Sequence, residues 1–167
     1  MSADLAQATD LYRQAAEQGL PKAQYSLGLM YDHGHGVARD AQQAMAWYCK
    51  AAERGNAHAQ FSLGLRYDAG NGVLQDAGKA FSWYRRAAEQ GHARAQFNLG
   101  TMYAEGHGTD SDPVQAWAWL DLAAGHGMQQ AMRTRTLLGL RMTAAQRSDA
   151  ATLAQQLQRK PTQENPG

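Results

Sequence analysis

The segment Ala51-Ala52-Glu53-Arg54-Gly55 decides the fold of this chain, because it returns along the sequence at intervals of 36 residues. The other copies are residues 15–19, residues 87–91 and, in a weaker form, residues 123–127. Further residues recur with the same spacing: Leu27/Leu63/Leu99, Gly28/Gly64/Gly100, Tyr31/Tyr67/Tyr103 and Asp4/Asp40/Asp76/Asp112. A fixed period of this length is typical of an array of stacked structural units that share one continuous core.

Each unit carries the signals of two helices. Asp40 stands three residues before Gln43 and opens an apolar series that closes before Gly55, which predicts a capped amphipathic helix. Glycine suits that end because it adopts the left-handed conformation without a side-chain clash. A second helix is expected from about His58 to Ala69. Its expected apolar stripe is Ala59, Phe61, Leu63, Leu65 and Tyr67.

Gly28, Gly64 and Gly100 recur in the interior of the second helices. Glycine there costs about 1 kcal/mol relative to alanine, so a compensating gain is required. We expect the rings of Tyr48 and Tyr84 to pack against helix backbone that has no side chain at these positions.

The expected fold is an all-α solenoid of antiparallel helix pairs. Thr143 and Gln146 resemble a capping box, and a stripe of alanine and leucine follows them, which predicts a last helix that covers the end of the array. The expected boundaries are residues 4–39, 40–75, 76–111 and 112–140 for four repeats, 141–160 for the capping helix and 161–167 for a disordered tail.

The amino-acid composition argues against some classes of binding partner. The formal net charge is +1, from 16 basic and 15 acidic residues, which gives no electrostatic footprint for nucleic acid. No apolar run approaches the roughly 20 residues that span a bilayer, so no membrane partner is expected. The single cysteine, Cys49, excludes an internal disulfide framework. A cytoplasmic protein is expected from the chain as it stands, or a periplasmic one if a leader has been removed.

Signals of catalysis and metal binding are weak. His33 and His35 flank a turn glycine, but no second histidine follows at helical spacing. The chain contains no Ser-x-x-Lys, Gly-x-Ser-x-Gly or His-Glu-x-x-His motif, and Cys49 has no histidine beside it in sequence. We therefore expect no catalytic residue, no metal and no cofactor.

The recurring patterns Ala-x-x-x-Leu-Gly-x-x-Tyr, Gly-x-Gly-Val and Ala-x-x-Trp-Tyr-x-x-Ala-Ala-Glu-x-Gly closely resemble the Sel-one-like (Sel1-like) repeat family, a relative of the tetratricopeptide repeats. The resemblance covers most of the chain. It implies a right-handed superhelix of helix pairs whose concave face holds a protein or peptide. Some cysteine-rich relatives tie each pair with a disulfide and are associated with weak beta-lactam chemistry; this chain, with one cysteine, lacks that pairing.

The residues expected to bind a partner lie on the outer ridge of the first helices, opposite the buried stripe on a helical wheel. These positions vary between repeats while the inner positions recur. The predicted site residues are Arg13, Gln42, Ala46, Cys49, Lys50, Ser82, Arg85, Arg86 and Asp121. The same ridge in the fourth unit includes Val114, Ala118 and Leu122. The alternative is an ordinary solvated face with Arg13/Glu17 and Arg85/Glu89 as ion pairs.

These patterns indicate a non-enzymatic scaffold or adaptor that binds a protein or peptide in the groove of a helical-repeat superhelix. Two alternatives stay open. One is an enzyme that hydrolyses beta-lactams, as in the cysteine-rich relatives. The other is a structural protein whose arrays self-associate, end to end or through their grooves.

Overall fold

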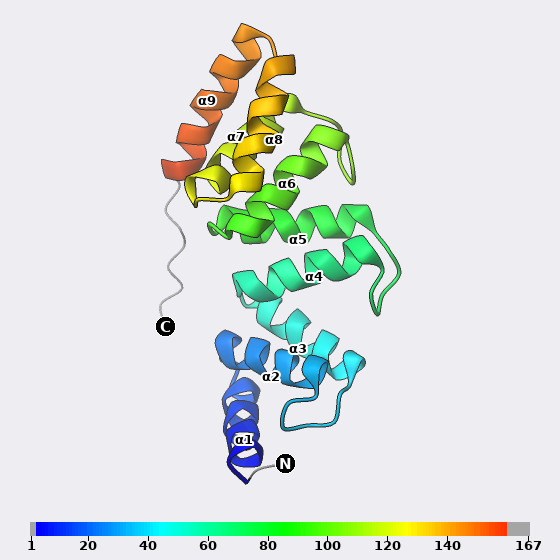
Figure 1. The fold of residues 1–167 in the computed structure, drawn as a ribbon. Coiled ribbons are helices and arrows are strands. Elements are labelled where there is room, and N and C mark those ends of the chain that lie inside the picture. The colour runs from blue at the N-terminus through cyan, green and yellow to red at the C-terminus, as the bar shows by residue number, and fades with distance from the viewer. Residues whose placement is uncertain (1–2, 160–167) are drawn as a thin grey trace. The chain divides into compact units, whose positions relative to one another are not determined.

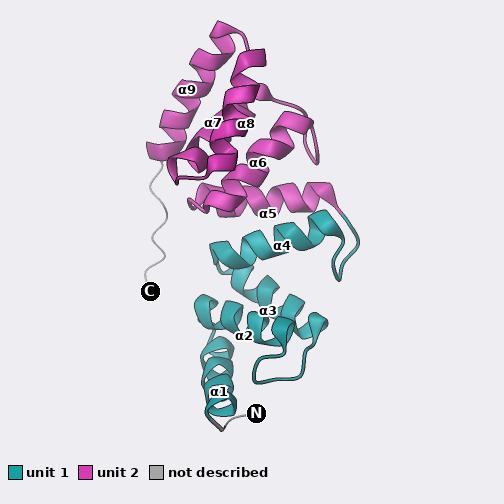
Figure 2. Cartoon of the chain, viewed as in Figure 1, with its two compact units in different colours: residues 1–75 teal, residues 76–167 magenta. Residues whose placement is uncertain are grey.

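The structure is a computed structural model that describes residues 3–159, so the tail predicted at 161–167 lies outside the described residues. Every regular element in the described range is an α-helix (Figure 1). The chain divides into two compact units, residues 1–75 and residues 76–167 (Figure 2). The predicted all-α class of consecutive helix pairs is confirmed.

The helices follow one another with short connections. Unit 1 contains α1 (Ala3–Glu17), α2 (Pro21–His33), α3 (Ala41–Glu53) and α4 (Ala57–Ala69). Unit 2 contains α5 (Ala77–Glu89), α6 (Ala93–Glu105), α7 (Pro113–Gly125), α8 (Gln129–Arg141) and α9 (Ala144–Arg159). None of these helices combines the length and apolar composition that a membrane crossing requires.

Aspartate side chains begin three of the helices, as the sequence predicted. Asp40 Oδ1 accepts hydrogen bonds from the backbone N–H groups of Gln42 and Gln43, at 2.9 and 3.0 Å. Asp76 and Asp112 cap α5 and α7 in the same way. Each cap satisfies N–H groups that have no partner within the helix, which is why these helices start at a fixed residue. Gly55 follows α3 with a φ of 91°, so the predicted left-handed ending is confirmed.

Unit 1 is built by packing each helix on the one before it, from α1 to α4. Tyr48 of α3 is buried, and a Cβ placed on Gly28 of α2 would lie 2.7 Å from its Cε1 atom. The expected packing of this ring against a bare helix backbone is therefore confirmed. In unit 2, Leu120 takes the place of the ring, 2.8 Å from a Cβ placed on Gly100.

A buried glutamine joins successive helices in three places, a feature that the sequence analysis missed. Each side-chain amide donates to a carbonyl near the end of the preceding helix: Gln24 Nε2 to Ala16 O at 3.1 Å, Gln60 Nε2 to Ala52 O at 3.0 Å, and Gln96 Nε2 to Ala88 O at 3.2 Å. The signal was present, since the Ala-Gln pair recurs every 36 residues. Each of these carbonyls also accepts a hydrogen bond from the backbone N–H of the glycine that follows its helix, so the glutamine adds a second bond, which ties two helices together.

The predicted stripe of α4 was wrong at one position. Leu65 is 41% exposed, whereas Arg66 is only 7% exposed. The reason is geometric: Leu65 lies two residues, or about 200°, from the buried Leu63, while Arg66 lies three residues away on the same face. Arg66 therefore brings a charged group into the space between α4 and its neighbours.

Unit 2 is organised around α7, which contacts α6, α8 and α9. Thr143 and Gln146 form the predicted capping box at the start of α9: Thr143 N–H donates to Gln146 Oε1 at 2.9 Å, and Gln146 N–H donates to Thr143 Oγ1 at 3.1 Å. Ala150 and Ala154 of α9 are buried. The role of α9 as a cap for the end of the array stays a prediction, because its described packing is on α7.

Candidate functional site

Four of the predicted partner-binding residues lie together on the outer face of α3. Gln42, Ala46 and Lys50 are exposed, and Cys49 is half-buried. The Lys50 ammonium lies 4.2 Å from the centre of the Trp47 ring, so the ridge is edged by a cation held against an aromatic face.

Cys49 has the environment of a poor nucleophile. Burial raises the pKa of its thiol, and the negative charge of Glu53 raises it further. The thiolate is the reactive form of cysteine, so a raised pKa lowers reactivity at neutral pH. The half-buried Cys49 thiol is therefore mostly protonated at neutral pH.

The equivalent face of α5 carries Ser82, Arg85 and Arg86, all exposed. Arg85 Nε contacts Glu89 Oε1 at 3.0 Å, the ion pair predicted for a solvated face. The Arg86 guanidinium lies 4.6 Å from the centre of the Trp83 ring. The cation and tryptophan arrangement of α3 therefore recurs one repeat later.

The remaining predicted residues lie on other helices, α1 and α7. Arg13 of α1 is half-buried and contacts Asp10 at 3.1 Å, whereas the alternative of a solvated face paired it with Glu17. Asp10 lies one turn earlier on the same helix face. Asp121 of α7 is half-buried and forms an ion pair with Arg135 of α8. Asp121 therefore holds two helices together within unit 2.

The outer ridge of α7 is not exposed, which corrects the prediction for the fourth repeat. Ala118 is fully buried and Leu122 is 8% exposed, because α9 packs on this helix. Their counterparts in the earlier repeats, Ala46 and Lys50, are exposed. The wheel placed all four on one face correctly, but it could not show that a later helix covers the face in one repeat.

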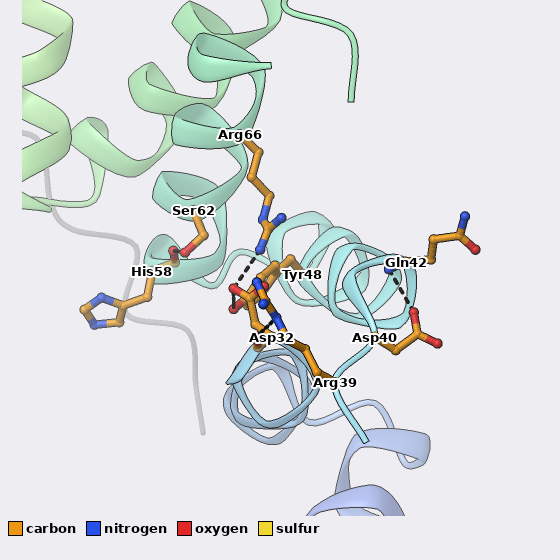
Figure 3. A network of polar contacts seen from close by, with 8 residues as sticks. All are labelled: Asp32, Arg39, Asp40, Gln42, Tyr48, His58, Ser62 and Arg66. Carbon is orange, nitrogen blue, oxygen red and sulfur yellow. Dashed lines mark hydrogen bonds and ion pairs between the residues drawn. The ribbon is translucent and has the colours of Figure 1, made fainter. Parts of the chain in front are cut away.

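A polar cluster in unit 1 was missed by the sequence analysis (Figure 3). Asp32 Oδ2 accepts hydrogen bonds from Arg66 Nη2 at 2.7 Å and from the Tyr48 hydroxyl at 3.2 Å. The cluster lines a pocket of about 340 Å³ that also includes Leu65 and Ser62. A signal existed: Met30 and Met102 hold the places of Arg66 in the neighbouring repeats, so Arg66 breaks the pattern.

The cluster changes the acidity of its members. Burial raises the pKa of Asp32, but the hydrogen bond and positive charge of Arg66 outweigh burial and hold that pKa below its ordinary value. Burial, followed by the charge of Asp32, raises the pKa of Tyr48 well above its ordinary range. Asp32 is therefore ionised and Tyr48 neutral at physiological pH, and the cluster acts as a hydrogen-bonded ion pair.

Metal ligands do not gather in the part of the chain that the structure describes. His33 and His35 are exposed, with ring centres 5.6 Å apart. No group of three or more His, Cys, Asp or Glu side chains among the described residues is placed to hold a metal ion.

The Sel1 repeat profile matches this chain over residues 1–20, 21–56, 57–92 and 93–128. The matches at 21–56, 57–92 and 93–128 have the 36-residue period of the sequence and begin at the second helices of the first three predicted units, while the match at 1–20 covers α1. The predicted domain boundaries stay a prediction. No curated protein matches this chain.

Solved structures give the same fold. The chain is similar to a Sel1 repeat protein from Oxalobacter formigenes, with 38% identity, a TM-score of 0.73 and coverage of 75% of this chain and 94% of that one. It is similar to c5321, a protective antigen of uropathogenic Escherichia coli with the SLR fold, at 36% identity and a TM-score of 0.58, covering 90% of this chain and 40% of that one.

Helicobacter pylori cysteine rich protein B shares the fold at 24% identity and a TM-score of 0.61, covering 78% of this chain and 94% of that one. This similarity supports the fold of the chain and nothing further. The repeat matches, the helix-pair packing and the solved relatives agree, and this chain belongs to the Sel1 repeat family.

Proposed function

We propose that this protein is a non-enzymatic scaffold that binds a protein or peptide partner through the outer faces of α3 and α5. Helical repeats of the Sel1 type are a fold typical of protein–protein interaction. The proposed contact residues are those predicted from the sequence on these two helices, led by Lys50, Arg85 and Arg86.

The observation that carries this proposal is the packing of α9 on α7. α7 is the counterpart of α3 and α5 in the fourth repeat, and its outer face accepts a helix of the same chain. Ala118 and Leu122 are buried there as a result. A face that binds a helix in one repeat supports binding of a partner segment by the equivalent faces in others.

The exposed faces differ from that of α7 in their charge. Lys50 and Arg86 stand at the position of Leu122, and each lies against a tryptophan ring. Arginine and tryptophan are enriched among the residues that contribute most to binding at protein interfaces. A preformed face of this kind leaves most of the ordering cost to the partner.

The proposal gives Cys49 no catalytic role, since its thiol is half-buried with a raised pKa. An assay with a chromogenic beta-lactam tests the enzymatic alternative directly. The non-enzymatic assignment would be rejected if the purified protein hydrolysed the beta-lactam and lost this activity in Cys49→Ala. The activity should then persist when an unrelated surface residue is substituted.

Affinity capture from the native cell with mass spectrometry tests the scaffold function. We expect the double substitution Arg85→Glu with Arg86→Glu to reduce recovery of the wild-type partner at least tenfold, while helicity is unchanged. The matched control is Arg133→Glu with Arg141→Glu, two exposed arginines on α8. Equal recovery by the α5 variant and the wild type would remove α5 from the proposed interface.

A further inference from the structure

Two troughs lie at equivalent places in the two units, 72 residues apart in sequence. The Trp47 trough of unit 1 has a volume of about 390 Å³. The Trp119 trough of unit 2 has a volume of about 260 Å³. The first is lined by Glu17, Gln24, Trp47, Lys50, Glu53 and Arg54. The second is lined at the same repeat positions by Glu89, Gln96, Trp119, Leu122, Gly125 and His126.

The Trp119 trough is bordered by a helix of the same chain. Leu157 and Gln158, in the last turn of α9, form part of its wall beside Trp119 and Leu122. In unit 2, the last described turn of an amphipathic helix, with a leucine and an amide, therefore lies against this kind of trough. Among the described residues of unit 1, no helix fills the corresponding place in the Trp47 trough.

The floor of each trough holds a polar atom without a hydrogen-bond partner in the described chain. Gln24 is 3% exposed, and its Nε2 donates to Ala16 O, whereas its Oε1 has no donor. Gln96 repeats this arrangement in unit 2. Because Gln96 Oε1 stays unpaired although α9 borders its trough, this feature belongs to the packing of the repeat, and it does not select a ligand.

The rim of the Trp47 trough suits a helix C-terminus better than the rim of its counterpart. Lys50 and Arg54 stand where the Trp119 trough has Leu122 and His126, while Glu53 replaces Gly125. The last carbonyls of a helix have no intrahelical partner and carry a partial negative charge, which cations stabilise. The substitutions therefore add two permanent cations and one carboxylate to the lining, relative to the trough that α9 borders in unit 2.

We propose that the Trp47 trough is a binding site for the C-terminal turn of an amphipathic helix from a partner protein. A leucine of that helix packs on Trp47, and its terminal carbonyls face Lys50 and Arg54. This inference rests on the proposed scaffold function and assigns it a ligand class. The occupant is a different protein rather than a second copy, because α9 of a second copy is already packed on its own α7.

Nuclear magnetic resonance on the full ¹⁵N-labelled chain tests the site. The probe is a synthetic peptide with the sequence of residues 143–159 and an amidated C-terminus, which reproduces the capped helix and its leucine. We expect a saturable shift of the Trp47 indole N–H signal on titration. The peptide in which Leu157 is replaced by aspartate should give no saturable shift of the Trp47 signal.

Two protein variants make the test specific. Lys50→Glu with Arg54→Glu should weaken peptide binding about tenfold or more, since both cations at the rim are reversed. Lys22→Glu, an exposed charge reversal on α2 outside the trough, should leave binding unchanged. The spectra themselves report whether each variant is folded.

The inference would be overturned if the Trp47 signal did not shift at saturating peptide, or if its shift were the same in Lys50→Glu with Arg54→Glu. A shift of the Trp119 signal alone would also overturn it, because the peptide would then be competing with α9. A Trp47 signal that moves with protein concentration alone would assign the trough to a second copy and also reject the proposal. If Trp47 is silent while partner capture still depends on Arg85 and Arg86, the trough fails and the scaffold function stands.

Discussion

α3 and α7 occupy the same position in the repeat, yet one presents its outer face to solvent and the other buries it. Both begin at a capping aspartate and both press their inner face on a helix with an interior glycine. Their outer faces differ: Ala46 of α3 is exposed, while Ala118 of α7 is fully buried beneath α9. The repeat pattern therefore determines the inner face, and the surrounding chain determines what the outer face does.

The strongest test of this comparison places one charge on each outer face. Ala118→Asp should lower the free energy of unfolding by about 3 kcal/mol or more, because a carboxylate without a partner would be buried between α7 and α9. Ala46→Asp, at the matched position of α3, should change it by less than about 0.5 kcal/mol. Chemical denaturation followed by circular dichroism measures both.

Ser82→Asp extends this control to α5, where the matched position is also exposed. If Ala118→Asp were as mild as the two controls, α9 would not be held firmly on α7. The main support for the proposed interface would then be lost.

The inner face between α2 and α3 should not accept a side chain at Gly28. Gly28→Val should cost about 2 to 3 kcal/mol, because its Cβ would meet the Tyr48 ring at 2.7 Å and the ring is buried. Gly78→Ala is the matched control in an exposed helix position, where the nearest atom to an added Cβ is Asp76 Oδ1 at 3.5 Å. It should be neutral or stabilise by up to about 1 kcal/mol.

Thermal melting of the two glycine variants separates close packing from helix propensity. A similar melting temperature for Gly28→Val and the wild type would mean that α2 and α3 can move apart at no cost. That result contradicts the close packing seen at Tyr48.

The Asp32 cluster distinguishes unit 1 further and predicts a dependence on pH. Asp32→Asn should lower the free energy of unfolding by about 2 kcal/mol at neutral pH, since Arg66 would keep its burial but lose the carboxylate. The folded pKa of Asp32 is below its ordinary value of 3.8, so its contribution is fully present above that pH and is lost as pH falls through the folded pKa. The gap between wild type and variant should therefore close in acid.

A double variant identifies the cause. Asp32→Ala with Arg66→Met replaces the ion pair by apolar residues. Methionine is the residue that the neighbouring repeats carry at the position of Arg66. It should cost less than Asp32→Asn alone, because no charge is left buried without a partner. Urea denaturation at several pH values compares the three proteins, and a gap that stays constant into acid would contradict the assigned pKa.

The fold could be predicted from the sequence because its determinants are local and repeated. Asp40, Asp76 and Asp112 start helices, and Gly55 and its copies follow helix ends, so these elements are specified within a few residues. Asp4 is the exception, because it lies inside α1. The sequence-based prediction failed where it depended only on the angular position of a residue around its helix. Leu65 was placed inward although Arg66 takes that direction, and the buried Gln24 series was not considered because glutamine is mostly a surface residue.

The candidate site could be predicted only in part. The exposure of Gln42, Lys50, Ser82, Arg85 and Arg86 follows from the helical wheel and the boundaries of α3 and α5. The burial of Ala118 does not, because it depends on where α9 packs. The Asp32 and Arg66 pair spans 34 residues and joins two helices, so neither residue signals its partner within a local window.

The smallest effect is expected at the start of α9, where the difference between α3 and α7 originates. Thr143→Ala removes one half of the capping box and should cost about 1 kcal/mol. Thr152→Ala in the same helix is the matched control and should be neutral or slightly stabilising, since Thr152 is exposed and its hydroxyl bonds only to the Ser148 carbonyl. Amide hydrogen exchange measures the stability of each helix separately. The amides of α9 should exchange faster in Thr143→Ala than in the wild type, while the amides of α3 keep their wild-type rates. Equal acceleration in both helices would mean that α9 opens only with the whole protein, and the outer face of α7 would then be part of a single cooperative core.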